Sequence, residues 1–539
     1  MTSKRFSRLW ITLLTLAVII VIPLTGGCKK QAGGVVRGGT LNDWFSDDPA
    51  GIDPQVDTTL MVYRLARDIY STLLRYQGDT FNLEPDACAE MPTVSADGLT
   101  YHFKLRPDIK FHDGTVMTSK DVKFTMERML NPATQAANAW VYEPIKGAKA
   151  VENGQATSLE GFKIISDTEF ELTLERPFAP FLHYLAIPPS SIFPEKACTE
   201  AKDAWRMHPV GSGPFELAEY VPDDHIRLVK NPDYFEEGLP YLDEVFIRIV
   251  PDDDTGRLEF ENGTMDVSFL PTDVPEDMAR YFRMRDEGKY QILESTPANT
   301  YYFAFNLKVP QVSKLEVRQA IAYAIDKQKL IDTIWGGTAV EAKNFISPGI
   351  PGAWAEAPGY HYDLGKAKAL MAKAGVTSMN LEIAQRGGDT PSDTNVALQA
   401  MLKEIGINVQ IKIFDRATFN DMRGQGNLPC AYGNWWADFP DPDNYLYTYF
   451  HSSQAKNMST NVNDPELDKL LEAARAEPDP NKRWPMYAEA EKKIVYDNCW
   501  IIPLWHLKDY VVLQPNVRGW VMTPTGVYSY KTVYKVSTK

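Results

Sequence analysis

The sequence predicts an α/β fold that is built from more than one domain. At 539 residues the chain is longer than one ordinary hydrophobic core requires, and this length indicates about two to four domains. Segments with the two-residue period of a strand and with the 3.6-residue period of a helix follow one another along it. The composition, 44% hydrophobic and 24% charged, is that of a globular protein without collagen-like or disordered bias.

Residues 1–27 have the pattern of a secretory signal peptide. Three basic residues, Lys4, Arg5 and Arg8, precede an uncharged run, LWITLLTLAVIIVIPL, and then the small residues TGG. The uncharged run is shorter than the roughly 20 residues that a membrane-spanning helix needs. We therefore expect export, with a retained N-terminal membrane anchor as the alternative.

The segment TGGC, which ends at Cys28, resembles the lipidation site of bacterial lipoproteins, with Thr25 in place of the usual leucine. The resemblance implies an exported protein, in the periplasmic space or at the cell surface, that is anchored to a membrane through lipidated Cys28. A cysteine that carries several acyl chains is a firm anchor. The Gly- and Lys-rich residues 28–38 are predicted to be its flexible tether.

The charge balance excludes one class of partner. The chain carries a net charge of −15, and removal of residues 1–27 takes away three positive charges and no negative ones, which leaves −18. Nucleic-acid binding requires a basic face, so we expect no nucleic-acid partner.

Four cysteines remain after Cys28, and they are widely spaced: Cys88, Cys198, Cys430 and Cys499. None forms a CxxC pair, so the spacing of a zinc knuckle is absent. An oxidising compartment permits disulfides, and buried free thiols are the alternative. The spacing does not decide between them.

Strand and helix patterns alternate in the first half of the chain. Residues 98–106 and 167–175 alternate apolar and polar side chains, as half-buried strands do. Between them, residues 118–130 have helical spacing behind a capping box formed by Thr118 and Asp121.

The second half contains stronger helix signals. Residues 313–331 are predicted to begin with a capping box of Ser313 and Glu316, and residues 363–375 run from a capping Asp363 to Gly375. Residues 464–476 begin with Asp464 and Pro465, a favoured helix start. A further helix is expected near residues 481–497, with a late start because Pro485 lies near its beginning. Residues 501–513, IIPLWHLKDYVVL, are predicted to form one buried strand.

Residues 379–414 have the pattern of one βαβ unit. The strands MNLEIAQ and INVQIKIF flank a helix whose apolar side chains align on one face. If both strands share a sheet, the crossover is right-handed, and ligands bind beyond the carboxyl ends of such strands. Arg386 follows the first strand and is therefore a candidate ligand-binding residue.

The sequence contains no recognisable catalytic or metal motif. VGSGPF at 210–215 is not a nucleophile elbow, and the eight histidines form no HExxH pair. DPDN at 441–444 superficially resembles a calcium loop, but it lacks the glycine and the distal glutamate that such a loop requires. A turn capped by its own Asp and Asn side chains is the better interpretation. We therefore expect no enzyme activity, no metal site and no cofactor.

Six blocks in order resemble one protein family. They are GGTLNDWFSDDPAGIDP, FHDGTVMTSKDVKFTMERM, HPVGSGPFEL, VKNPDYFEEGLPYLDEV, EVRQAIAYAIDKQKLI and NWWADFPDPDNYL. The chain is similar, from about residue 38 to about residue 520, to the extracellular solute-binding proteins of bacterial peptide-type ABC transporters, the oligopeptide- and dipeptide-binding group. The resemblance implies two α/β lobes joined by a hinge, with an extra third domain on one lobe.

The resemblance also implies domain boundaries and partners. Lobe I is discontinuous, and the other two domains are continuous: lobe I has residues 39–65, 206–300 and 512–539, the extra α/β domain has 66–205, and lobe II has 301–511. Closure of the lobes buries the ligand by a hinge motion. The closed protein, expected to be a monomer, then meets the permease subunits of the transporter.

Asp438 acquires a role from the same resemblance. In relatives that bind peptides, the acid of a W-x-x-D stretch at this place pairs with the α-ammonium of the ligand, and Trp435 and Asp438 match that stretch. A buried ammonium must be paired, because an unpaired charge costs several kcal/mol. The alternative is that Asp438 only caps its loop.

Arg386 resembles the arginine that takes the peptide carboxylate in dipeptide-binding relatives, and its guanidinium suits a two-point grip on a carboxylate. The following GGDTPSD differs from those relatives, and a surface ion pair is the alternative for Arg386.

Further pocket-lining residues are implied at places where the family lines its pocket: Trp44, Phe45, Trp505 and His506. Trp435 and Trp436 alternate on a strand and should face opposite sides, one lining the cleft and one packed. We expect Trp435 to serve the ligand and Trp436 to belong to the scaffold. For each aromatic residue, ordinary core packing is the alternative.

The sequence thus favours a lipid-anchored binding protein that captures di- or oligopeptides between two lobes and delivers them to a permease. The same fold with an oligosaccharide, a nickel complex or another small solute is the main alternative. A secreted hydrolase and a sensing receptor are alternatives of other classes.

Overall fold

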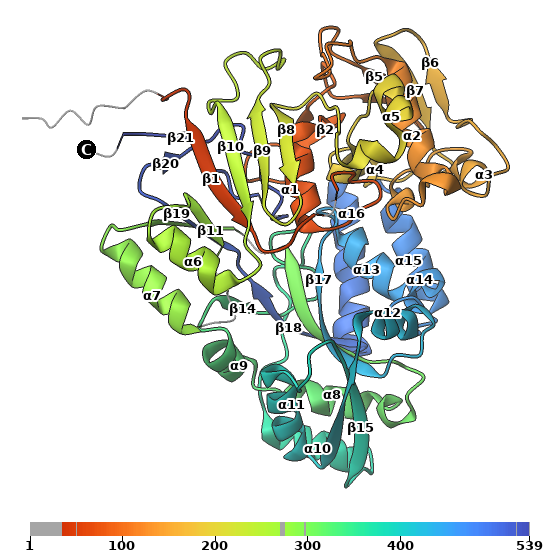
Figure 1. The fold of residues 1–539 in the computed structure, drawn as a ribbon. Coiled ribbons are helices and arrows are strands. Elements are labelled where there is room, and N and C mark those ends of the chain that lie inside the picture. Colours follow the sequence, from red (N-terminus) through yellow and green to blue (C-terminus); the bar gives the residue numbers. More distant parts are fainter. Residues whose placement is uncertain (1–34, 50, 270–274, 296–297, 524, 538–539) are drawn as a thin grey trace, which may run out of the picture. The chain divides into compact units, whose positions relative to one another are not determined.

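The beginning of the chain forms a sheet with segments that lie about 200 residues further on. The computed structural model describes residues 35–49, 51–269, 275–295, 298–523 and 525–537 (Figure 1). The first sheet has the order β1 (Thr40–Phe45), β10 (Glu244–Ile249), β9 (His225–Lys230) and β8 (Phe215–Val221). β1 is parallel to β10, and the other neighbours are antiparallel. Tyr530 and Val533, near the end of the chain, are buried in the core of this sheet.

A second sheet has three strands, two from the middle of the chain and one from near its C-terminal end. Its order is β11 (Val267–Phe269), β19 (Tyr510–Leu513) and β12 (Gln291–Glu294), with β19 antiparallel to both neighbours. Helices α6 (Asp253–Glu261) and α7 (Pro275–Asp286) contact β11 and β12 (Figure 1). The core of this part includes Trp44, which lies in β1.

The third sheet confirms the alternating strands predicted in the first half. Its order is β4 (Thr93–Val94), β5 (Thr100–Lys104), β7 (Glu169–Thr173) and β6 (Phe162–Ile164). Phe103 and Phe170 are fully buried and stack on one another across β5 and β7. Helix α2 (Ser119–Leu130) begins with the predicted capping box of Thr118 and Asp121.

The largest sheet has six strands and includes the predicted βαβ unit. Its order is β14 (Ala339–Glu341), β18 (Ile501–Leu507), β13 (Asn299–Ala304), β17 (Cys430–Trp436), β15 (Met379–Arg386) and β16 (Ile407–Phe414). β15 and β16 are parallel and are joined through α11 (Asp393–Lys403), which packs on β16, so the βαβ prediction is confirmed.

The remaining elements are shorter or surround these sheets. The helices are α1 (Leu60–Ile69), α3 (Ala148–Glu152), α4 (Phe181–Tyr184), α5 (Glu195–Ala201), α8 (Leu315–Ala324), α9 (Lys327–Ile334), α10 (Leu364–Lys373), α12 (Arg416–Gly424), α13 (Pro442–Phe450), α14 (Ser452–Ala455), α15 (Pro465–Ala476) and α16 (Pro480–Glu491), which continues as a π-helical segment, Lys492–Asp497. The short strand pairs are β2 (Leu74–Tyr76) with β3 (Leu83–Pro85), and β20 (Val517–Arg518) with β21 (Tyr534–Lys535).

Two helix starts differ from the prediction. α8 begins at Leu315 without a side-chain cap, because the Ser313 hydroxyl donates to the Pro310 carbonyl of the preceding turn. α16 begins at Pro480 and includes Pro485, so the late start was wrong. Asp479 caps this helix, and Pro480 at its first position is a strong start signal that the prediction overlooked. The caps Asp363 and Asp464 are confirmed.

The predicted single strand over 501–513 is two strands in different sheets. β18 belongs to the six-stranded sheet, and β19 belongs to the three-stranded sheet, with Lys508 and Asp509 between them. The chain makes the reverse passage between β12 and β13. Both segments look alike in the sequence because β18 and β19 are buried along their whole length.

The four cysteines of the described chain are buried and free: Cys88, Cys198, Cys430 and Cys499. Cys28 and the predicted signal peptide lie outside the described residues, as does most of the predicted tether. Within the described ranges, no helix combines the length and apolar character needed to span a membrane.

Candidate ligand-binding site

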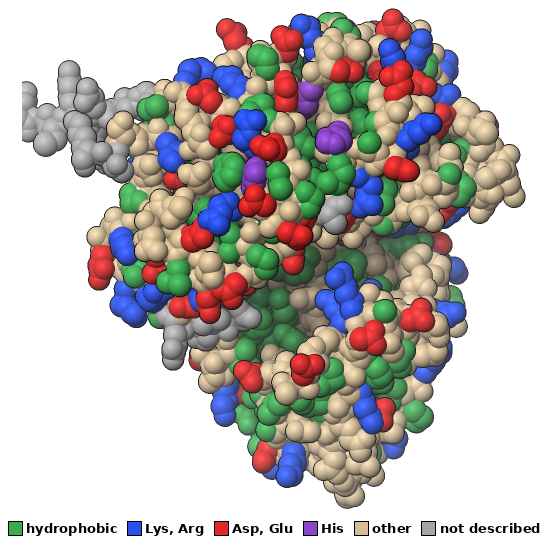
Figure 2. Space-filling model, viewed as in Figure 1, with side chains coloured by type: hydrophobic (Ala, Val, Ile, Leu, Met, Phe, Trp, Pro, Cys, Tyr) green, Lys and Arg blue, Asp and Glu red, His purple; other side chains and the backbone are tan. Residues whose placement is uncertain are grey.

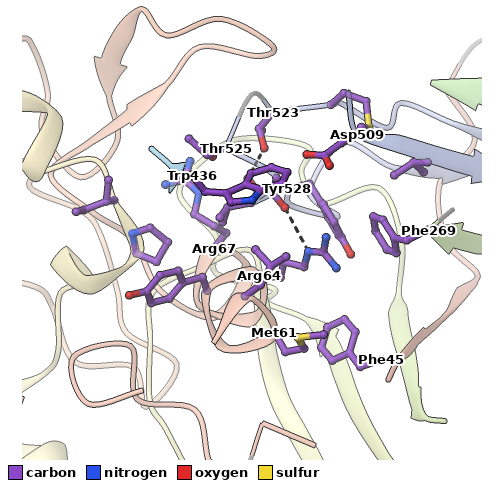
Figure 3. Close-up of a pocket in the computed structure, with 18 of the residues that line it drawn as sticks. Phe45, Met61, Arg64, Arg67, Phe269, Trp436, Asp509, Thr523, Thr525 and Tyr528 are labelled. Atoms are coloured by element: carbon purple, nitrogen blue, oxygen red, sulfur yellow. Dashed lines mark hydrogen bonds between the residues drawn. The ribbon is translucent and has the colours of Figure 1, made fainter. Parts of the chain in front are cut away.

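A cavity of about 630 Å³ lies between helix α1, the end of β17 and the C-terminal part of the chain (Figure 3). Arg64 of α1 lies in its wall, with its guanidinium over the rings of Phe269 and Tyr528. The Arg64 Nε donates to the Gly526 carbonyl at 3.2 Å. Figure 2 shows that this face of the molecule is hollowed between the part with β8 to β10 and the part with β15. The cavity has the size of a small-solute site, and its wall is mostly apolar with several aromatic side chains.

Asp438 lines this cavity and is held in place by one buried side chain, Asn444. The Asn444 amide donates to the Asp438 carboxylate at 3.1 Å, and its oxygen accepts from the Asp438 backbone N–H at 3.1 Å. The Asp438 carboxylate is open to the cavity but surrounded by protein, and this burial raises its pKa, against the hydrogen bond from Asn444. Asp438 forms no ion pair with any residue in the described ranges.

Trp435 fixes Asn444 rather than lining the cavity. Its indole N–H donates to the Asn444 oxygen at 2.9 Å, and its ring packs edge-on against Tyr449. Trp436, by contrast, lines the cavity and is 38% exposed (Figure 3). The two rings therefore face opposite sides of β17, as their alternation on the strand predicts. Their assignment is the reverse of our expectation: Trp436 lies at the cavity, and Trp435 belongs to the scaffold.

Two buried ion pairs hold the acidic turn that follows Asp438. Both Asp441 oxygens accept from the Arg483 guanidinium, at 2.5 and 2.8 Å. Both Asp443 oxygens accept from Arg475, at 2.9 and 2.7 Å. Asp441 also caps α13 by accepting from the Asp443 N–H. These contacts agree with the self-capped turn that we preferred to a metal loop, and they tie the turn to α15 and α16.

Trp44 and Phe45 line the cavity, but both are nearly buried. Trp44 packs so tightly on α6 that a Cβ added to Gly256 would lie 2.6 Å from its ring. Phe45 lies at the cavity wall (Figure 3) and is 2% exposed. Both side chains thus belong to the core, and only their edges reach the cavity wall.

Trp505 and His506 do not line either of the two cavities described here. Both lie on β18, and Trp505 is 0% exposed, packed on Tyr301 and Trp335. His506 Nδ1 donates to the Asn299 carbonyl at 2.8 Å, and burial lowers its pKa to about 4. The expectation that these two residues line the pocket is corrected, because β18 lies inside the sheet between β14 and β13.

Arg386 lines a second cavity, of about 270 Å³, which lies beside the first. Residues of β17 connect the two: Gly433 and Asn434 line the second cavity, and Trp436 lines the first. Arg386 is exposed at the end of β15, and its guanidinium makes no hydrogen bond or ion pair within the described chain. The structure thus brings Asp438 and Arg386 to neighbouring cavities, not to one.

An open strand edge runs between these two residues. β17 pairs with β13 from Ala431 to Trp436, but it pairs with β15 only at Cys430 and Ala431. From Tyr432 to Trp436, one edge of β17 therefore has no strand partner among the described residues. An exposed edge of this kind is a template for an added strand.

Three features of the site were not predicted from the sequence. Asn444 orients Asp438, Arg64 and Tyr528 form a cavity wall, and Arg423 of α12 lines the second cavity. One signal was present for Arg423: Phe419 lies four residues earlier, so both residues occupy one face of α12. No local signal connects Asn444 with Asp438 before the loop conformation is known.

Comparisons with known proteins agree with this arrangement. Residues 82–457 match the family model of bacterial extracellular solute-binding proteins, family 5. A heme-binding protein A from Haemophilus influenzae is 29% identical over 510 residues, which cover 91% of this chain and 90% of the relative. A dipeptide-binding protein from Escherichia coli is 27% identical, with 92% and 95% covered.

A solved structure extends the similarity to the fold. The periplasmic binding protein DppA from Helicobacter pylori, in complex with peptide STSA, superimposes with a TM-score of 0.78 and 26% identity. The match covers 93% of this chain and 99% of that chain. The predicted two-lobed α/β binding-protein fold is confirmed. This chain belongs to family 5 of the bacterial extracellular solute-binding proteins.

Proposed function

We propose that the protein captures peptides outside the cytoplasm and delivers them to an ABC-type permease, without catalysing a reaction. The Asp438 carboxylate carries this proposal. It is oriented by Asn444 at the wall of a cavity of about 630 Å³, and no cation of the described chain pairs with it. The α-ammonium of a peptide supplies the missing charge through charge-assisted hydrogen bonds.

The open edge of β17 supports an extended, peptide-like ligand. Backbone groups of a peptide add to such an edge through hydrogen bonds that do not depend on the side chains. Arg386, at the second cavity, is the proposed partner of the peptide carboxylate. A strand-like ligand along β17 would thus reach from the Asp438 cavity toward the Arg386 cavity.

Two of the three proteins compared above point to a peptide ligand, and the third is named for a different ligand. The Escherichia coli relative is named for dipeptides and the Helicobacter pylori structure contains a peptide, whereas the Haemophilus influenzae relative is named for heme. An oligosaccharide would stack on Trp436, the exposed aromatic residue of the cavity. A neutral sugar, however, leaves the Asp438 charge unbalanced, so the peptide is favoured.

We also propose how the protein is exported and how it moves. Removal of residues 1–27 and lipidation of Cys28 account for the basic, apolar and small-residue pattern at the start of the sequence.

The proposed hinge consists of the two places where the chain passes between the three-stranded and the six-stranded sheet. One lies between β12 and β13, and the other lies between β18 and β19.

Mass spectrometry of the ligand released from purified, denatured protein tests the proposed function. Short peptides are the expected ligands, and peptides added to ligand-free protein should bind with a stoichiometry of one. The Asp438→Asn variant, purified in the same way, should carry less peptide. Recovery of a sugar, a metal complex or heme in place of peptide would contradict the proposal.

Replacement of Asn444 with alanine tests how Asp438 is held. The variant removes a donor from the Asp438 carboxylate and leaves the Trp435 N–H without its acceptor. We expect about tenfold weaker peptide binding and about 1–3 kcal/mol lower stability, the usual cost of unpaired buried polar groups. Calorimetry and urea unfolding measure the two effects. Unchanged peptide affinity in a folded variant would show that Asp438 needs no such support.

A further inference from the structure

The second cavity is positively charged in a protein that is otherwise acidic. Arg386 of β15 and Arg423 of α12 both line it, and its lining residues include no Asp or Glu. The whole chain, by contrast, carries a net charge of −15. Two like charges at one small cavity repel each other unless an anion lies between them.

Neither guanidinium is satisfied within the described chain. Arg386 and Arg423 make no side-chain hydrogen bond and no ion pair with any described residue. Arg475 and Arg483 show the usual arrangement, since each binds both oxygens of a buried carboxylate. The two arginines of the cavity therefore retain all their donors for a ligand.

The charges of both arginines act on one buried hydroxyl. Burial raises the pKa of Tyr302, and the hydrogen bond with Tyr449 and then the charges of Arg423 and Arg386 lower it. The Tyr302 hydroxyl lies 2.8 Å from that of Tyr449. Both arginines and Tyr302 line this one cavity.

Arg423 has a simpler alternative role. It lies in the last turn of α12, where a cation interacts favourably with the helix dipole. That role does not require the side chain to line a cavity. Arg423 lines the cavity together with Phe419, four residues earlier on the same face of α12, and opposite charges on the wall are absent.

We propose that this cavity binds the carboxyl end of a peptide that bears two anionic groups there, as a C-terminal Glu or Asp does. The inference rests on the proposed peptide-binding function. Arg386 binds the α-carboxylate, and Arg423 binds the side-chain carboxylate of the last residue. Each guanidinium offers the two-point geometry that suits a carboxylate.

The site also has room and polar atoms for a residue rather than a lone carboxylate. Its volume is about 270 Å³. The Asn395 Oδ1 is buried at its wall without a hydrogen-bond partner in the described chain. A backbone N–H of the bound peptide would satisfy this oxygen, which is an acceptor only.

Calorimetry with matched peptides tests the inference. The peptides are alanine peptides of two to four residues that end either in Glu or in Gln, so that one charge is the only difference. We expect the wild type to prefer Glu by tenfold or more. In Arg423→Gln the preference should fall below about threefold, and Arg423→Lys should retain part of it.

Arg416→Gln is the matched control, because it removes the same charge from the exposed start of the same helix. It should leave the preference unchanged. Equal binding of Glu and Gln peptides by the wild type, or a full preference in a folded Arg423→Gln variant, would overturn the inference while peptide binding stands. If no peptide of either series binds the wild type, the proposed function fails as well.

Discussion

Replacement of Asp438 with alanine is expected to weaken peptide binding by at least 2 kcal/mol, about 30-fold. The variant removes the carboxylate that we propose as the partner of the ligand ammonium, and that loss is the largest single effect we expect on affinity. Asn444, which now orients the carboxylate, would lose its acceptor at the same time. Isothermal titration calorimetry of a peptide into the ligand-free variant measures the change.

Asp253→Asn is the control for this experiment. Asp253 lines the same cavity and is exposed, so its replacement removes an equal charge from the same wall. It should change the affinity by less than about threefold, in the range of exposed charges. An equal loss in both variants would assign the effect to the overall charge of the cavity, and an unchanged affinity in Asp438→Ala would remove the ammonium role.

The same residue predicts the pH dependence of binding. Burial raises the pKa of Asp438 above its ordinary value of 3.8, and only the ionised form attracts an ammonium. Affinity should therefore be full well above the raised pKa and should fall as the pH drops through it. Across that window, binding releases a proton from Asp438. In Asp438→Ala this part of the pH dependence should be absent.

Replacement of Arg483 with methionine is expected to have the largest effect on stability. The Asp441 carboxylate, 1% exposed, would stay buried without its two guanidinium hydrogen bonds. Breaking a buried pair in this way costs about 3–5 kcal/mol. Because Asp441 caps α13, the loss should also disturb the loop that carries Asp438. Urea unfolding and peptide calorimetry measure the two consequences.

Lys482→Met provides the comparison, since Lys482 immediately precedes Arg483 and its side chain is 67% exposed. Its ion pair with Asp479 is long, at 4.0 Å, and should contribute little. The double variant Arg483→Met with Asp441→Asn should recover part of the lost stability, because it removes the buried unpaired charge. A small loss in Arg483→Met alone would contradict a structural role for this pair.

Much of the fold was predictable because its signals are local. The βαβ unit of residues 379–414, the Thr118 capping box and the apolar–polar alternation within β5 and within β7 all depend on neighbouring residues. Helix periodicity, caps and strand alternation report on hydrogen bonds and burial within a few positions. One prediction failed because two local signals competed. Pro485 predicted a late start of α16, but the helix begins at Pro480 behind its cap Asp479.

The family and the two-lobed fold followed from six blocks of sequence, and so did attention to the stretch NWWADFPDPDNYL. The sequence of this stretch predicted that Trp435 and Trp436 face opposite sides. It did not predict which of the two rings packs into the protein. That choice depended on Asn444, which accepts the Trp435 N–H, and on Tyr449, which packs against its ring. Both partners belong to α13, whose position is set by contacts with α15 and α16.

Tertiary packing alone separated Asp438 from Arg386 and joined Arg386 with Arg423. Asp438 follows β17, Arg386 ends β15, and Arg423 lies on α12. The partners of each residue come from elements whose order in space no local pattern encodes. Local sequence decides which backbone conformation a segment takes, because its hydrogen bonds close within a few residues. Which charges meet across a cavity is decided by how the finished sheets and helices pack, since that burial depends on distant parts of the chain.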